Sequence, residues 1–361
     1  MKKRNLLFHN KVDIIIPTYN RPDFLKRILD YYQINGKVLN FIIADSSSSL
    51  NKKRNKKIID SYPKLSILYL DKFSEKLSQH HKFAEVIKYA SSKYVCFCAD
   101  DDFIVPNGIK AAVNFLEKNS DYSAAHGTYI SFYINKGLFN SKKFWWRFLY
   151  SPHSISSPSP QNRLKSHLAN YTLVAWAVQR TNIAKIYHNE FLKYKIDPYL
   201  LPVFGELLPD ALTVIYGKIK YLNTLYGARQ AFSQILSSYP SLIDAKKAGI
   251  YNEEYRRFKN CLLNNLAKVD NTSKEKSAEI IDAAMEKYIK YSYQEHLVNK
   301  LNRILKHFPE FLQKGFRFLH AIYLFTKEKK GQIGLIDNPS SKYFNDFESI
   351  RQIVLQHNQQ L

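Results

Sequence analysis

The first 118 residues alternate between short apolar runs and amphipathic stretches, and this alternation limits the possible folds more than any other feature. The apolar runs are rich in β-branched or aromatic residues and have the length of buried strands: 12–16, 38–44, 66–70 and 94–98. A helical pattern follows each run, starting near Pro22, Asn51, Glu75 and Pro106. Strands that alternate with helices form parallel sheets with right-handed crossovers. We therefore predict an α/β fold with a mostly parallel sheet sandwiched by helices.

The fourth apolar run stops at three adjacent carboxylates, Asp100, Asp101 and Asp102. Neighbouring carboxylates repel one another and lose solvation when a fold draws them together, so a cation among them explains the pattern most simply. Ligands of open α/β sheets bind beyond the carboxyl ends of the strands. The acids therefore predict a metal-dependent site at this edge. A solvated acidic turn before the next helix is the alternative.

Polar residues also follow the first two strands. Pro17-Thr18-Tyr19-Asn20-Arg21 forms a predicted turn after the first strand, and Asp45 ends the second. Because parallel strands place their carboxyl ends at one edge, we expect this turn, Asp45 and the three acids to line one crevice.

Two further acids lie in a predicted helix that opens at Gly205 and runs to Tyr216. Glu206 and Asp210 are four residues apart, so they share one helix face. Acids at helix N-termini are also common stabilisers, because the helix dipole favours negative charge there.

The remaining chain is less regular up to residue 235 and helical beyond it. The expected elements are one or two strands at 122–133, an aromatic cluster at 144–148, a connector or substrate lid at 151–160, a helix at 161–170, strands at 173–179 and 218–225, and a loop at 227–230. The expected C-terminal helices are 253–267, 273–291, 295–307, 309–327 and 345–356. The basic segment 301–325 is expected to pack on its own domain, with contact to a membrane surface as the alternative.

The composition limits which kinds of binding partner and which cellular compartment we expect for this protein. The chain carries 54 Lys and Arg against 31 Asp and Glu, a formal charge of +23, which favours polyanionic partners without choosing among them. Its three cysteines have no zinc-site spacing, and Cys96 and Cys98 are expected to be buried thiols. No signal-peptide pattern or membrane-length apolar run is present in the sequence. We expect a cytoplasmic protein, with contact to the inner face of the cytoplasmic membrane left open.

Three of these segments resemble motifs of family 2 glycosyltransferases with the GT-A fold. Asp13-Ile14-Ile15-Ile16-Pro17-Thr18-Tyr19-Asn20-Arg21 resembles their first-strand signature, and Cys98-Ala99-Asp100-Asp101-Asp102 resembles their Asp-x-Asp motif. Gly205-Glu206-Leu207-Leu208-Pro209-Asp210, followed by the strand at 218–222, resembles their acidic motif, although the family often has a second acid where Leu207 stands. The resemblance covers about residues 11 to 235. It implies a GT-A-like domain at 1–235 and a helical C-terminal region at 236–361.

The resemblance implies an inverting transfer of a sugar from a nucleotide-diphosphate donor to an acceptor hydroxyl, in cell-surface or lipid-linked glycan synthesis. The implied metal is Mg²⁺ or Mn²⁺, held by Asp100 and Asp102, and the implied general base is Glu206, with Asp210 as second candidate. The implied donor-binding residues are Pro17, Thr18, Tyr19, Asn20, Arg21, Asp45, Lys82, Asp100 and Asp101. His81 and Arg229 are further candidates for contact with the diphosphate.

Two other functions remain open at this point. A nucleotidyltransferase can share such a carboxylate–metal site, but the turn after the first strand lacks the glycines of a phosphate-binding loop. A non-enzymatic basic binder of membranes or nucleic acid would follow from the charge alone, but no specific nucleic-acid module accompanies it. The sequence does not name the sugar, the base or the acceptor.

Overall fold

The computed structural model describes residues 11–36, 39–136, 142–149, 153–172, 174–193, 196, 198, 200–231, 242–270, 273–305 and 333–357. The basic residues 1–10, the helix predicted at 309–327 and most of the basic segment 301–325 lie outside the described residues.

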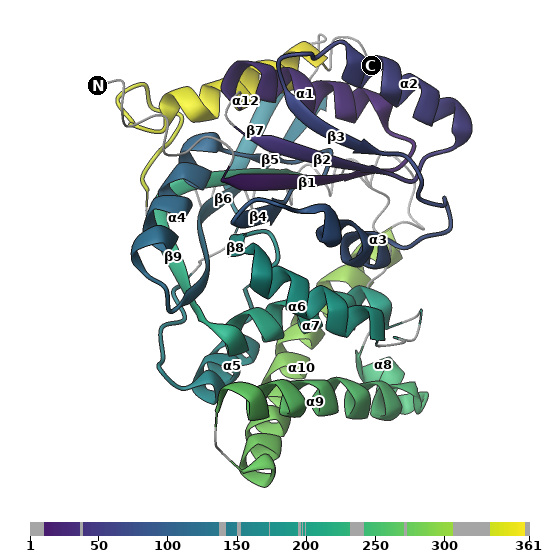
Figure 1. Cartoon of the computed structure of the whole chain (residues 1–361), viewed down its shortest axis with the longest axis vertical. Coiled ribbons are helices and arrows are strands. Elements are labelled where there is room, and N and C mark those ends of the chain that lie inside the picture. Colours follow the sequence, from purple (N-terminus) through teal and green to yellow (C-terminus); the bar gives the residue numbers. More distant parts are fainter. Residues whose placement is uncertain are drawn as a thin grey trace.

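The first half of the chain forms the predicted parallel sheet (Figure 1). Strands β1 (Val12–Thr18), β2 (Asn40–Asp45), β3 (Ser66–Leu70) and β4 (Tyr94–Phe97) lie in the order β3-β2-β1-β4. All three pairings in this part are parallel. The expected mixed α/β fold with a mostly parallel sheet is thus confirmed.

Helices cover both faces of this sheet. These helices are α1 (Pro22–Asn35), α2 (Ser49–Asp60), α3 (Gln79–Val86) and α4 (Pro106–Lys118). Proline at the first position starts α1 and α4, and serine side chains cap α2 and α3. Helix α3 is shorter than the predicted stretch from Glu75, because Ser78 caps it and a 3₁₀ turn at Ile87–Tyr89 ends it.

The second half of the sheet mixes strand directions. It consists of β5 (Phe103–Ile104), β6 (Tyr122–Lys136), β7 (Lys142–Phe148), β8 (Val178–Arg180) and β9 (Lys218–Gln230). The aromatic cluster forms β7, which pairs with β6 in an antiparallel hairpin. Two expectations were wrong here. The strand predicted at 173–179 is reduced to β8, and the loop predicted at 227–230 continues β9, where it pairs with β5 and β6.

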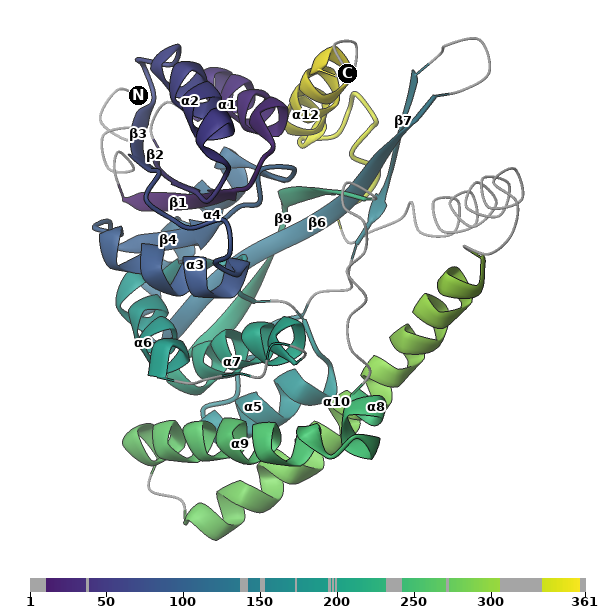
Figure 2. The ribbon, with the colours of Figure 1, turned by 90° about the vertical axis from the view of Figure 1, so that its right-hand side faces the viewer.

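A second group of helices lies below the sheet (Figure 2). It contains α5 (Pro160–Ala169), α6 (Thr181–Lys193), α7 (Leu201–Tyr216), α8 (Leu242–Lys247), α9 (Ile250–Val269) and α10 (Lys274–Leu305). Helix α10 is continuous where two helices were predicted. Helix α7 starts at Leu201 and not at Gly205, so Glu206 lies beyond its first turn. Stabilisation by the N-terminal dipole therefore does not account for this acid.

The last helix, α12 (Phe344–His357), returns to the first half of the chain and packs on α1. His357 Nε2 lies 2.7 Å from an oxygen of Asp30, and Asn35 donates a hydrogen bond to Ser349 Oγ at 2.8 Å. Phe347 adds its ring to the aromatic side chains Phe144 and Trp146 of β7. Residues near both ends of the described chain therefore share one layer (Figure 2).

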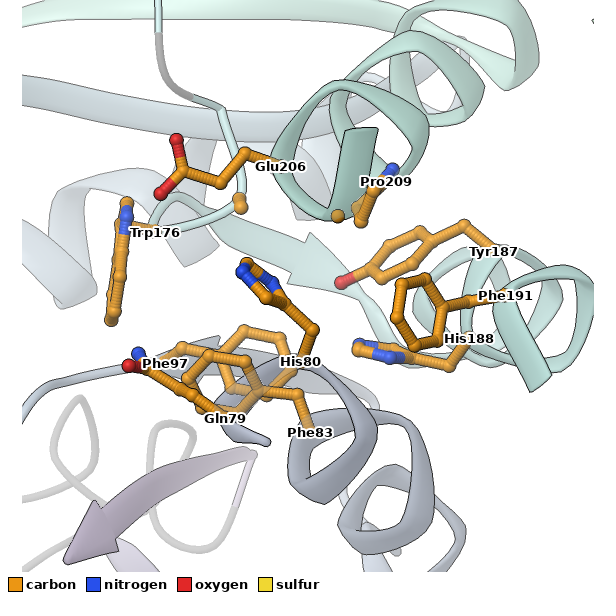
Figure 3. A pocket seen from close by; sticks show the side chains of 12 residues that line it. Gln79, His80, Phe83, Phe97, Trp176, Tyr187, His188, Phe191, Glu206 and Pro209 are labelled. Atoms are coloured by element: carbon orange, nitrogen blue, oxygen red, sulfur yellow. The ribbon is translucent and has the colours of Figure 1, made fainter. Parts of the chain in front are cut away.

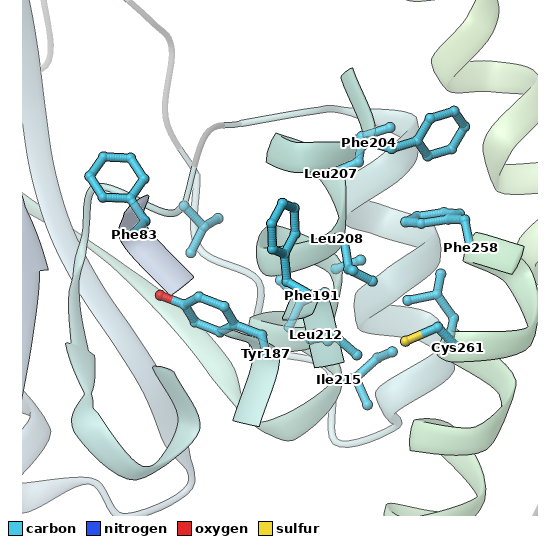
Figure 4. Close-up of a cluster of buried hydrophobic side chains, with 14 of the residues drawn as sticks. Phe83, Tyr187, Phe191, Phe204, Leu207, Leu208, Leu212, Ile215, Phe258 and Cys261 are labelled. Carbon is cyan, nitrogen blue, oxygen red and sulfur yellow. The ribbon is translucent and has the colours of Figure 1, made fainter. Parts of the chain in front are cut away.

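Two hydrophobic cores lie on opposite faces of the sheet. Alternate residues of β1 divide between them: Ile14 and Ile16 face α1, α2, α4 and α12, whereas Ile15 faces α3, α6 and α7. In Figure 4, Phe204, Leu207 and Leu208 of α7 lie close to Phe258 of α9. Cys96 and Cys98 are buried free thiols, as expected, and Cys261 is a third. Among the described helices, none combines the length and apolar character required to cross a membrane.

Candidate active site

The polar strand ends meet at one edge of the sheet, as the sequence predicts. The hydroxyl of Thr18, at the end of β1, donates a 2.8 Å hydrogen bond to Asp100 Oδ2, which follows β4. Lys82 reaches the same edge from α3 and donates to the Thr18 carbonyl at 3.2 Å and to Ser46 Oγ at 2.6 Å. Burial lowers the pKa of the Lys82 amine to about 8, against the opposing charges of Asp100 and Asp45.

The predicted turn after β1 is joined to the segment after β2. Asn20 has a left-handed backbone with φ of 53°, a conformation that asparagine tolerates better than most residues. Its amide donates to Ser47 Oγ at 2.8 Å, and its side-chain oxygen accepts from the Ser48 amide at 2.9 Å. The adjacent Tyr19 side chain is exposed. The turn therefore presents an exposed phenol beside a backbone that hydrogen bonds hold to the segment after β2.

Asp45 is fully buried, and its carboxylate is extensively hydrogen bonded within the protein. One oxygen accepts from the Ser47 amide at 2.7 Å, and the other accepts from Asn55 at 2.8 Å and from the Tyr69 phenol at 2.6 Å. Asp45 thus fixes the loop after β2. Its predicted contact with the nucleoside stays a prediction.

The three adjacent acids are surrounded by three arginines. The guanidinium of Arg21 lies 3.1 Å from Asp100 Oδ1 and 2.7 Å from Asp101 Oδ2. The same guanidinium packs over the ring of Phe24. The residues that hold the other side of this cluster come from distant parts of the chain. Asp102 contacts Arg229 Nε through Oδ2 at 3.3 Å and accepts from the backbone amide of Gln230 through Oδ1 at 3.0 Å. Arg27 donates to the Asp101 carbonyl at 2.8 Å and to Gln230 Oε1 at 2.6 Å.

Burial raises the pKa of Asp100 to about 6 and that of Asp102 to about 7, although Arg21 and Arg229 act in the opposite direction. A divalent cation would favour the charged forms of both groups. Mg²⁺ in proteins commonly takes one or two carboxylates together with substrate phosphates and water. The two acids fit that donor set, and no cluster of three His, Cys, Asp or Glu suited to a metal occurs among the described residues.

A pocket lies between α3, α6, α7 and the end of β4, with the carboxylate of Glu206 in its wall (Figure 3). Its lining residues are Gln79, His80, Phe83, Phe97, Ala175, Trp176, Tyr187, His188, Phe191, Gly205, Glu206 and Pro209. The next residue, Leu207, is completely buried in the hydrophobic core beneath α7. An acid at position 207 would therefore be buried among apolar side chains, which explains why the sequence departs from the two-acid pattern here.

The second candidate base, Asp210, lies in a different environment from Glu206. It is completely buried and does not line the pocket. Its Oδ2 accepts hydrogen bonds from the Tyr171 phenol at 2.9 Å and from the Val174 amide at 3.2 Å. Burial and the charge of Glu206 together raise the pKa of Asp210 to about 8, although the hydrogen bonds from Tyr171 and Val174 act in the opposite direction. Asp210 is thus protonated at neutral pH and holds the segment before Trp176.

Trp176 connects the pocket to the three acids. Its ring lines the pocket, and the guanidinium of Arg229 lies 5.6 Å from the ring centroid, a cation–π distance. The Trp176 carbonyl accepts hydrogen bonds from Tyr129 at 3.1 Å and Tyr226 at 2.9 Å, which fix its position. Arg229 therefore contacts both Asp102 and the pocket wall.

One residue predicted to lie near the diphosphate, His81, makes other contacts, and sequence reasoning missed three residues of the candidate site. His81 contacts Ser78 Oγ at 2.7 Å and packs edge-on against Phe191, so it belongs to the cap of α3. Arg27, Gln230 and Trp176 were not predicted as site residues. Arg27 lies in the apolar helix pattern of α1, and no local signal distinguishes it from a surface arginine.

Comparison with known proteins agrees with this geometry. Residues 13–182 match the model of glycosyl transferase family 2. No curated protein sequence matches the chain. S. aureus TarS 1–349 in complex with UDP-GlcNAc has a TM-score of 0.51 and 15% identity, over 97% of this chain and 92% of that chain. The mannosyltransferase PcManGT from Pyrobaculum calidifontis, in complex with GDP-Man and Mn²⁺, has a TM-score of 0.44 and 11% identity, over 97% and 87% of the two chains.

The fold and the matched segment define the class of protein: an enzyme with the GT-A fold, built around strand ends that carry an Asp-x-Asp sequence. The match over residues 13–182 identifies this segment as a glycosyl transferase family 2 domain, and thus as the part of the chain that makes it a glycosyltransferase. The resemblance predicted from the sequence is confirmed at this level.

Proposed function

We propose that the enzyme is an inverting, metal-dependent transferase that moves a sugar from a nucleotide diphosphate to an acceptor hydroxyl. The observation that supports this proposal most strongly is that two chemically different sites adjoin Trp176. On one side lie buried acids and basic groups at the strand ends, and on the other lies the pocket with Glu206. A transfer between two substrates needs such a pair of adjacent places, one for the leaving diphosphate and one for the attacking hydroxyl.

The residues at the strand ends would hold the donor. The exposed ring of Tyr19 offers a surface for the base, and the turn from Pro17 to Arg21 would enclose the nucleoside together with Asp45. Lys82 and Arg229 would place positive charge toward the diphosphate, because each is already held at the same edge. A divalent ion held by Asp100 and Asp102 would neutralise the departing diphosphate.

Glu206 would act as the general base. Its carboxylate lines the pocket, where an acceptor hydroxyl could approach it, whereas Asp210 is buried and protonated near neutral pH. A single base with in-line displacement gives inversion, because no covalent glycosyl intermediate is required. We further propose a role in cell-surface or lipid-linked glycan synthesis, in the cytoplasm or at the inner membrane face. The formal charge of +23 would favour the second location.

The decisive experiment is a donor screen that follows release of the nucleoside diphosphate, with Mn²⁺, with Mg²⁺ and with EDTA. UDP-GlcNAc and GDP-Man are the first donors to test, since solved structures of similar fold contain them. We expect release from at least one nucleotide sugar, dependent on a divalent ion and reduced at least 100-fold in Asp102→Asn. Full activity in EDTA would exclude the metal role, and diphosphate release from a nucleoside triphosphate would indicate a nucleotidyltransferase.

The assignment of the base is tested by a matched pair of variants. Glu206→Gln should reduce transfer at least 100-fold while donor binding is retained. Asp210→Asn, which resembles the protonated acid, should retain transfer within about threefold. The opposite ranking of these variants would assign the base to Asp210.

A further inference from the structure

Among the residues that the structure describes, no lysine or arginine lines the pocket beside Glu206. Its lining contains several aromatic rings, two histidines and a single carboxylate. This composition contrasts with the formal charge of +23 on the whole chain. A phosphate or carboxylate that entered the pocket would lose its hydration without gaining an opposite charge from these lining residues, because Arg229 packs against Trp176 and is not among them.

His188 brings two ring nitrogens without hydrogen-bond partners to the described lining of the pocket. It is 3% exposed, and neither ring nitrogen has a hydrogen-bond partner in the part of the chain that the structure describes. Its ring packs against Phe97 at 5.3 Å and Tyr187 at 4.3 Å between centroids. Buried polar groups usually find partners, so a ligand in this pocket would meet an available donor and acceptor.

His80 adds a second imidazole, in the middle of the pocket in Figure 3. Burial lowers the pKa of His80 to about 4 and that of His188 to about 3. Both rings are therefore neutral at physiological pH. A neutral imidazole exchanges hydrogen bonds with hydroxyl groups but gives no charge attraction to an anion.

The aromatic walls favour the same kind of ligand. Phe83 lies 4.5 Å from Phe97 and 6.0 Å from Trp176 between ring centroids, so the rings form a continuous apolar wall. Apolar ring faces can be covered by the C–H face of a sugar ring, while the imidazoles bind its hydroxyl groups.

We propose that this pocket selects an uncharged, hydroxyl-bearing sugar unit as the reacting end of the acceptor, and that it rejects units carrying carboxylate or phosphate. This inference rests on the proposed function, because it takes the pocket as the acceptor side of the transfer. His188 and Trp176 are its specificity-determining residues. Anionic parts of a longer acceptor would lie outside the pocket.

The test uses calorimetry on the full-length protein, with methyl glycosides of glucose, galactose and mannose, each paired with its uronate. We expect at least one neutral glycoside to bind, and its uronate to bind at least 10-fold more weakly. Folded His188→Phe should weaken the binding of the neutral glycoside about 5-fold, the size expected for one lost hydrogen bond. His167→Phe is the matched control, because His167 is also buried and lacks a partner in the described structure but lies outside the pocket.

Nucleotide release is measured on the same samples, so that the two proposals fail separately. Equal or tighter binding of a uronate, unchanged binding in His188→Phe, or no binding of any glycoside overturns the selectivity. Selective binding without turnover of any nucleotide sugar supports the pocket and contradicts the proposed transfer. Turnover with a uronate as the better acceptor supports the transfer and contradicts the pocket.

Discussion

Gly205 lies so close to His80 that a Cβ atom at position 205 would be 2.8 Å from Cγ of the imidazole. This contact joins α7 to α3 at the pocket, immediately before Glu206. Glycine is favoured at this position because the opposing atoms belong to a partly buried imidazole ring, which would have to shift to admit a methyl group. The glycine of the acidic motif therefore sets how closely Glu206 approaches the pocket.

Gly205→Ala should destabilise the protein by about 1–3 kcal/mol, because the added methyl group forces the two helices apart. His80→Ala in the same chain should recover most of this loss, since it removes the opposing ring. Urea unfolding of both single variants and the double variant measures the coupling. Strictly additive effects would show that the contact does not limit the approach.

Asp210→Asn should become more stable relative to the wild type as the pH rises from about 5 to about 8. The pKa of Asp210 is raised by burial from its ordinary value of 3.8 to about 8, so the folded state holds a proton that the unfolded state releases. Folding stability that depends on this proton is present at low pH and is lost as the pH rises, by at most about 1.4 kcal/mol per pH unit. Urea titrations at several pH values measure the difference, and a pH-independent difference would contradict the assignment.

The catalytic efficiency toward the donor should decline above about pH 8, if Lys82 binds the diphosphate as proposed. Burial lowers the pKa of this amine to about 8, so the free enzyme loses the positive charge above that pH. Lys82→Met should lower kcat/KM about 10- to 100-fold and remove the alkaline decline. Lys88→Met, which alters a lysine on the exposed surface nearby, should leave the profile unchanged. An alkaline decline that persists in Lys82→Met would assign it to another group.

Trp176→Ala should weaken the binding of UDP or GDP in the presence of Mn²⁺ by about 5- to 10-fold, because Arg229 loses the ring against which it packs. Trp176→Phe should retain most of the affinity. Phe83→Leu is the control, since Phe83 lines the same pocket and contacts Trp176 but has no described contact with Arg229. Equal losses in Trp176→Ala and Phe83→Leu would show that the effect arises from the pocket wall as a whole.

Arg27→Met should destabilise the protein by about 2–4 kcal/mol and weaken nucleotide binding. Arg27 is 3% exposed and holds both the Asp101 carbonyl and Gln230, so its removal frees both sides of the acid cluster. The side chain of its neighbour Lys26 forms an exposed ion pair with Asp30, and Lys26→Met should change stability by less than about 0.5 kcal/mol. Denaturant unfolding compares the two variants, and equal effects would contradict the role given to Arg27.

The sequence predicted the first half of the sheet well, because each strand there is followed by its own helix and the pattern is local. Strand β3, at Ser66–Leu70, has the predicted bounds. The second half depends on pairings that no local pattern reveals. Residues 227–230 contain glycine and read as a loop, yet they form strand because β5 and β6 lie on either side.

In the candidate site, too, the residues that follow strands could be predicted from the sequence, whereas those placed by tertiary contacts could not. Thr18, Asp45 and the three acids were placed together because strand ends meet at one edge. Arg27 and Trp176 were missed because their roles arise from tertiary contacts with residues more than 50 positions away. The hydrogen bonds that hold the buried Asp210 likewise come from Tyr171 and Val174, which no spacing rule connects to it.

The packing of α12 on α1 has a consequence for biosynthesis. The core on that face of the sheet includes Phe347, Ile350 and Val354, which the ribosome adds long after the strands they cover. Because these residues are still missing when β1 and α1 emerge, the first half of the sheet cannot complete its packing at that stage. The apolar surface that α12 covers therefore stays exposed until residues 344–357 have left the ribosome.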